Sequence, residues 1–131
     1  MRHRVSGYKL GRTSASRKAL FRNLVTECLK RGKVRTTYAK AKAVQPKIEK
    51  IITLGRKGTL NDRRKAAAYI NETQVLEELF SVTAKKFDKR NSGYTRITKL
   101  GYRKGDSSHM VEIAILDDLA PITSEEDENN E

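Results

Sequence analysis

Residues 92–116 read SGYTRITKLGYRKGDSSHMVEIAIL, and they change the periodicity of the chain from helical to extended. Side chains alternate between two faces over residues 94–100, and residues 111–116 form a second apolar segment. The glycine-containing loop between them is typical of an antiparallel hairpin. The segment therefore predicts two paired strands, with Arg103 and Lys104 at the tip of their loop.

A third strand is predicted upstream, over residues 33–38. Val34, Thr36 and Tyr38 alternate there with more polar residues, and β-branched side chains are frequent. A strand this short is not stable alone. We therefore expect it to join the hairpin in one small three-stranded mixed sheet.

Four helices are predicted outside these strands, because apolar residues recur there at helical spacing. We expect them over residues 14–31, 39–57, 59–70 and 74–87. Gly32 and Gly58 end the first two, and Thr59 with Asp62 resembles a capping box for the third. Pro46 removes a backbone donor inside the second helix, so we expect a kink or a break there. The predicted fold class is α+β, with about four helices packed on the sheet.

The charge of the chain excludes several classes of protein. The 131 residues carry 28 Lys and Arg against 16 Asp and Glu, and residues 1–65 contain 20 basic residues and only 3 acidic ones. No apolar run approaches the roughly 20 residues that a membrane helix needs.

The single Cys28 excludes an internal disulfide and belongs to an apolar helix face, which favours a core position over a nucleophile. Such a basic body requires a polyanion, with nucleic acid the leading candidate and an anionic membrane surface the second.

The two ends of the chain differ in charge. Residues 1–13 hold four Lys and Arg and no acid, which predicts an extended basic arm that orders against a partner. A frayed terminus is the alternative. Residues 119–131 hold five acids and no Lys or Arg, which predicts a disordered acidic tail. The tail either shields the basic body before assembly or only keeps the chain soluble. Residues 14–118 are expected to form a single RNA-binding domain.

Catalytic and metal-binding patterns are missing from the sequence. Cys28, His3 and His109 do not have the spacing of a zinc site, and no loop has the phosphate-binding order G-x-x-x-x-G-K. The residues from Asp106 to His109 are typical of a turn rather than of a catalytic triad. We therefore expect no enzyme activity, no metal, no cofactor and no small-molecule substrate. A small nuclease that uses Asp106, His109 and Glu112 is the alternative.

Cations and aromatic residues occur together along the arm, two helices and the hairpin. Tyr8, Tyr94 and Tyr102 stand among cations and could stack on unpaired bases, with packing in the core or on the sheet as the alternative. Lys18 and Arg22 lie at the edge of the first apolar helix face, where they could reach phosphates. No recognition helix, zinc finger or RNP motif is present, which favours shape-driven binding to folded RNA. A DNA-compacting protein is a third hypothesis.

Three segments resemble the bacterial large-subunit ribosomal protein seventeen family. They are the opening MRHRVSGYKLGRTSASRKALFRNL, TTYAKAKA at residues 36–43, and the hairpin sequence of residues 92–116. They occur in the family's order and cover the chain to about residue 118. The resemblance implies a structural constituent of the cytoplasmic large ribosomal subunit. It further implies contacts with ribosomal RNA and neighbouring ribosomal proteins near the exit of the nascent-chain tunnel, and no contact with a membrane.

The residues expected to bind RNA are basic or aromatic. Those carried over from the family's arm, first helix and hairpin are Arg2, His3, Arg4, Lys9, Arg12, Arg22, Arg96, Arg103 and Lys104. Those added from the sequence pattern are Tyr8, Lys18, Arg35, Lys40, Lys42 and Lys99.

Overall fold

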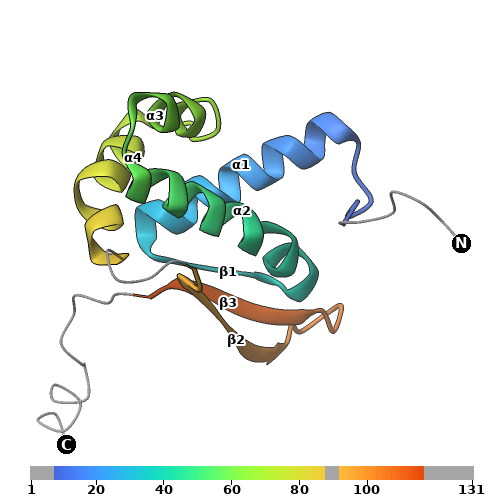
Figure 1. Cartoon of the computed structure of the whole chain (residues 1–131). Coiled ribbons are helices and arrows are strands. Elements are labelled where there is room, and N and C mark those ends of the chain that lie inside the picture. The colour runs from blue at the N-terminus through green and yellow to red at the C-terminus, as the bar shows by residue number, and fades with distance from the viewer. Residues whose placement is uncertain (1–7, 88–91, 117–131) are drawn as a thin grey trace, which may run out of the picture.

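The computed structural model describes residues 8–87 and 92–116, and its helices cover one face of a small sheet (Figure 1). The helices are α1 (Ser14–Arg31), α2 (Tyr38–Lys57), α3 (Leu60–Ala67) and α4 (Thr73–Glu78). The strands are β1 (Lys33–Thr37), β2 (Thr95–Tyr102) and β3 (His109–Ile115). This arrangement confirms the α+β fold class, with four helices packed on three strands. The predicted arm residues 1–7 and the predicted acidic tail lie outside the described residues.

The strand order is β1-β3-β2, and both neighbouring pairs are antiparallel. The prediction of a mixed sheet is therefore wrong. Val111 and Ile113 of β3 are buried, and β3 is the most apolar of the three strands. In the centre of the sheet, both edges of β3 are paired. Because β3 separates β1 from β2, the two strands that run in the same direction never pair.

Helix ends follow the chemistry of the caps. Thr13 precedes α1, and its Oγ1 accepts a hydrogen bond from the backbone N–H of Ser16 at 3.3 Å. The cap residue of α1 is thus Thr13. Gly32 ends α1 with φ 81°, a left-handed conformation that favours glycine. Helix α2 continues through Pro46 without a break.

The predicted capping box before α3 is confirmed. The hydroxyl of Thr59 donates to Oδ2 of Asp62 at 2.6 Å and accepts from the backbone N–H of Asp62 at 3.2 Å. The side-chain hydrogen bond from Thr59 is the main reason that the pKa of Asp62 is lowered.

The last two helices end earlier than the sequence predicts. Helix α3 ends at Ala67 instead of residue 70. Helix α4 ends at Glu78, and the chain continues through a π-helical turn, Leu79–Thr83, and a 3₁₀ turn, Ala84–Phe87. These turns still bring Leu79 and Phe87 into the core, so the burial pattern is met without a regular helix.

The core lies between α1, α2 and the sheet. Cys28 is fully buried there, and burial raises the pKa of its thiol to about 12, which confirms a packing role. Tyr94 is also fully buried. Its ring meets the ring of Phe87 edge-on at 5.0 Å, and its hydroxyl accepts a hydrogen bond from Nη1 of Arg56 at 3.0 Å. Tyr94 is therefore a core residue and not a base-stacking one.

Candidate nucleic-acid interface

One end of the molecule brings together the start of α1, the start of α2 and the loop between β2 and β3 (Figure 1). The ring of Tyr38, at the start of α2, stacks on His109, at the start of β3. The centroids are 5.3 Å apart and the rings are inclined by 11°. Residues from three separate parts of the sequence thus contribute to one surface.

A cleft of about 340 Å³ lies between the segment before α1, α1 itself and α2. We call it the basic cleft; its lining residues are Tyr8, Lys9, Arg17, Phe21, Lys42, Ala43, Pro46 and Lys47. Four of them are cations and none is an acid. Phosphate groups are the natural ligands of such a surface, because every charged side chain in it attracts an anion.

The sequence predicted Tyr8, Lys9 and Lys42 in this surface but missed Arg17 and Lys47. Arg17 and Phe21 are four residues apart on α1, as are Ala43 and Lys47 on α2, so each pair lies on one helix face. That spacing was the available signal. It does not show that the two faces meet, because they lie far apart in the sequence.

Local contacts hold two of the cleft cations in place. The guanidinium of Arg17 donates to the carbonyl of Arg12 and to Oγ of Ser14, each at 3.3 Å. The ammonium of Lys47 lies 5.0 Å from the centroid of the Phe21 ring, within cation–π distance. Both contacts order a charged side chain before a ligand arrives.

Three rings form a column beside the basic cleft, and we call Tyr38, His109 and Tyr102 the aromatic column. The Tyr102 and His109 centroids are 5.5 Å apart, and the ammonium of Lys42 lies 5.7 Å from the Tyr38 centroid. Tyr102 is 77% exposed. The column therefore extends from a cation of the cleft to the end of β2, and it offers ring surface on which an unpaired base can stack.

The hairpin loop is held by an internal ion pair. The guanidinium of Arg103 donates to both carboxylate oxygens of Asp106, and Oδ1 of Asp106 also accepts from the backbone N–H of Ser108 at 3.1 Å. The bonds from Arg103, followed by those from Ser108, hold the pKa of Asp106 well below its usual range. These contacts confirm a turn. They leave Lys104 as an exposed cation, whereas the charge of Arg103 is already balanced.

Arg35 and Arg96 are exposed on the face of the sheet opposite the core. Their strand neighbours Val34, Thr95 and Ile97 are buried or half-buried, so the alternation turns both arginines outward. Nε of Arg35 lies 3.4 Å from Oε2 of Glu112, opposite it on β3. This outer group is separate from the basic cleft. The exposed Lys18 and Lys99 and the half-buried Lys40 are not lining residues of the cleft either.

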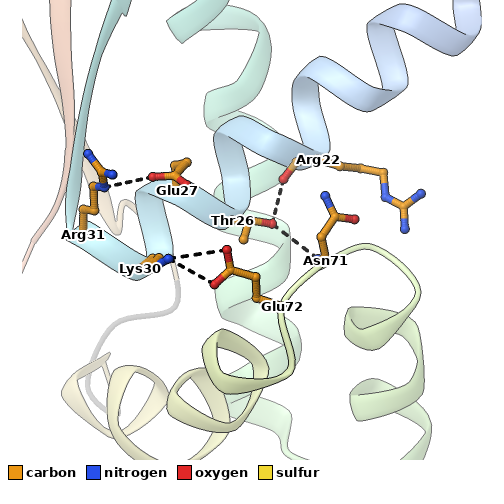
Figure 2. Close-up of polar contacts among 7 residues, drawn as sticks. All are labelled: Arg22, Thr26, Glu27, Lys30, Arg31, Asn71 and Glu72. Carbon is orange, nitrogen blue, oxygen red and sulfur yellow. Dashed lines mark hydrogen bonds and ion pairs between the residues drawn. The ribbon is translucent and has the colours of Figure 1, made fainter.

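Arg22 has a structural contact that the sequence did not indicate. Its guanidinium donates to the carbonyls of Ala68 at 2.8 Å and Tyr69 at 3.1 Å, just after α3. One turn further along α1, the hydroxyl of Thr26 donates to the carbonyl of Arg22 and accepts from the backbone N–H of Asn71 (Figure 2). These bonds fix α1 against the segment between α3 and α4.

Part of the expected interface lies outside the described residues, and the described part was also searched for metal-binding clusters and membrane helices. Arg2, His3 and Arg4 lie outside the described residues. Within residues 8–87 and 92–116, no group of three His, Cys, Asp or Glu side chains could hold a metal ion. No helix in the same two ranges is long and apolar enough to cross a membrane.

Comparison with known proteins decides the family. The family model described as Ribosomal protein L17 matches residues 20–116. The chain belongs to the ribosomal protein L17 family. Large ribosomal subunit protein bL17 of Desulforapulum autotrophicum is 48% identical over 118 residues, which cover 90% of this chain and 98% of that protein. The same protein of Trichlorobacter lovleyi is 48% identical over 121 residues, covering 92% and 98%. That of Acidobacterium capsulatum is 47% identical over 116 residues, covering 88% and 72%.

Membership of the L17 family makes the chain a structural constituent of the large ribosomal subunit, associated with the ribosome in translation, and not an enzyme. The nuclease alternative is therefore wrong. The structure gives the physical reason, since its three residues already have other partners. Asp106 is paired with Arg103, His109 lies between two tyrosine rings, and Glu112 is paired with Arg35.

Proposed function

We propose that the chain binds ribosomal RNA of the large subunit through the basic cleft, the aromatic column and the hairpin loop. The observation that carries this proposal is the cleft itself, which gathers four cations without an acid between α1 and α2. The proposal also assigns phosphate contacts to Arg2, His3, Arg4 and Arg12 of the arm. The particle is the cytoplasmic ribosome, and the binding site lies near the exit of the nascent-chain tunnel.

Recognition in this proposal depends on phosphate position and RNA shape. Lys and Arg neutralise phosphates and release counterions, which gives affinity without reading sequence. Tyr8 and Tyr102 are 47% and 77% exposed, and their rings suit bases that have left a helical stack. Folded RNA with unpaired nucleotides fits this surface better than a regular DNA duplex.

The test compares two pairs of substitutions that remove the same charge. Lys42→Gln with Lys47→Gln removes two cations of the cleft, and Arg64→Gln with Lys85→Gln removes two exposed cations elsewhere. Binding to a large-subunit RNA fragment is measured over a range of salt concentrations. We expect the slope of log affinity against log salt to become shallower by about two for the cleft pair only. Equal slopes for the two pairs would remove the cleft from the interface.

Location in the particle needs a second measurement. After gradient centrifugation at moderate salt we expect the protein with large subunits, whereas a DNA-compacting protein would sediment with nucleoid. Crosslinking from Lys104 in purified large subunits to RNA at the tunnel exit would support the proposed location. Crosslinks confined to RNA remote from the exit would contradict it.

A further inference from the structure

A second hollow lies along another face of α1, where this helix passes over strand β1. Its volume is about 580 Å³, and we call it the edge groove. Its lining residues are Leu20, Asn23, Leu24, Glu27, Arg31, Lys33, Val34, Arg35 and Glu112. Leu20, Leu24 and Val34 are half-buried and supply its apolar surface. Charged side chains of both signs surround them.

Strand β1 presents unpaired backbone groups to this groove. It is an edge strand, since β3 lies on its one paired side. The carbonyl of Gly32 accepts a hydrogen bond from the N–H of Ile115, and hydrogen-bonding direction alternates along an antiparallel strand. Val34 and Thr36 therefore face β3, whereas the N–H and C=O groups of Lys33 and Arg35 face the free edge. Within the described ranges, no backbone hydrogen bond outside the sheet uses these groups.

Two of the three cations that line the edge groove are paired with carboxylates, and Lys33 is the third cation. Nε of Arg31 lies 2.9 Å from Oε2 of Glu27, and Nε of Arg35 lies 3.4 Å from Oε2 of Glu112. Figure 2 shows Glu27 and Arg31 paired on α1, away from the contact of Lys30 with Glu72. Glu27 is one of only three acids in residues 1–65, so a carboxylate here is unusual for this chain. A phosphate would meet two carboxylates in this groove, which makes RNA a poor occupant.

We propose that the edge groove binds an extended segment of a neighbouring large-subunit protein, which adds to β1 as a fourth strand. Strand addition uses backbone groups for affinity and side-chain contacts for specificity. Lys33 and Arg35 supply two donors and two acceptors. Alternate side chains of the segment, if apolar, pack on Leu20, Leu24 and Val34, and flanking charges of both signs match the ion pairs. This inference goes beyond RNA binding and depends only on the place of the chain in the large subunit.

A second copy of the chain is a poor occupant for an electrostatic reason. Residues 1–65, which include α1 and β1, contain 20 basic and 3 acidic residues, so two copies joined at this edge would repel each other.

The test removes one backbone hydrogen-bond donor, the N–H of residue 35, from the free edge of β1. Arg35→Pro removes the side chain and the N–H that faces the groove, and the matched variant Arg35→Ala removes only the side chain. Proline is tolerated on an edge strand where its missing N–H faces outward. The probe is a photoreactive benzoylphenylalanine at position 23, in full-length protein assembled into large subunits. We expect a crosslink to another ribosomal protein, and its yield should fall about fivefold more in Arg35→Pro than in Arg35→Ala, the effect of one backbone hydrogen bond.

Other outcomes overturn the proposal. They are a crosslink only to RNA, to residues 117–131 of the same chain or to a second copy, or no crosslink at all. If Arg35→Pro does not fold, amide hydrogen exchange of the unsubstituted protein decides. The N–H groups of Lys33 and Arg35 should exchange rapidly in the free chain and slowly in the large subunit, and rapid exchange in both would end the proposal. Because the measurements do not use RNA affinity, they fail independently of the proposed function.

Discussion

The basic cleft and the edge groove both use helix α1, yet they differ in how their cations are partnered. Arg17 in the cleft bonds only neutral oxygens, whereas Arg31 in the groove is paired with Glu27. The two surfaces have similar numbers of cations but different chemistry. A basic stretch of sequence therefore does not define a nucleic-acid surface by itself. Whether a basic surface can bind nucleic acid depends on whether the folded chain places a carboxylate beside each cation.

The largest effect that we expect separates structural cations from binding cations on α1. Arg22→Ala should destabilise the fold by about 1–3 kcal/mol, because it leaves the carbonyls of Ala68 and Tyr69 without a charged donor. Arg22→Lys, which keeps the charge but not the two-armed geometry, should also be destabilising. Chemical denaturation measures the loss. If Arg22→Ala left stability unchanged but weakened RNA binding, Arg22 would belong with the cleft cations.

The next prediction sets the two surfaces against each other by charge reversal. Lys47→Glu places an acid in the basic cleft, and Arg31→Glu places one in the edge groove. The slope of log RNA affinity against log salt should become shallower by about one to two for Lys47→Glu and should barely change for Arg31→Glu. The two variants have the same net charge, so a general loss of attraction would affect them equally. Equal slopes would mean that partnering does not distinguish the surfaces.

Much of this fold followed from sequence patterns, because local rules determine it. Alternation over residues 94–100 and 111–116 predicted the hairpin, and Gly32 and Gly58 marked helix ends. Strand order could not be predicted from the sequence patterns, because it depends on which strand is stabilised most by hydrogen bonding along both of its edges. The length of α4 did not follow either. A π-helical turn and a 3₁₀ turn bury Leu79 and Phe87 as well as a regular helix would.

The candidate site was less predictable than the fold. Alternation shows which face a strand residue occupies but not how deep that face lies, so Tyr94 could not be separated from Tyr102 before the core was known. Arg17 and Lys47 were missed because only the packing of α1 on α2 brings them together. His109 was considered as a catalytic residue, whereas it stacks between Tyr38 and Tyr102.

Arg103 is the exception in the proposed RNA-binding surface, because it is paired with an acid, and its pairing predicts a pH dependence. The folded pKa of Asp106 lies below its unfolded value, so its contribution to stability is complete above the unfolded pKa of about 3.9 and is lost as pH falls below it. Asp106→Asn should lower the Tm at neutral pH, and the difference from the unsubstituted protein should shrink in acid. A constant difference would show that the ion pair does not hold the loop.

The smallest effect concerns the acid that distinguishes the edge groove. Glu27→Gln removes the partner of Arg31 in an exposed pair four residues apart, which should cost about 0.3–0.5 kcal/mol of stability. It also leaves Arg31 as an unpaired cation beside Lys33, so the groove becomes more like the cleft. RNA affinity at low salt should therefore rise slightly, with a slope steeper by up to about one. Glu78→Gln, which removes an exposed acid that lines neither hollow, is the control for net charge. If Glu27→Gln left the slope unchanged, the groove would repel RNA by shape and not by its carboxylates.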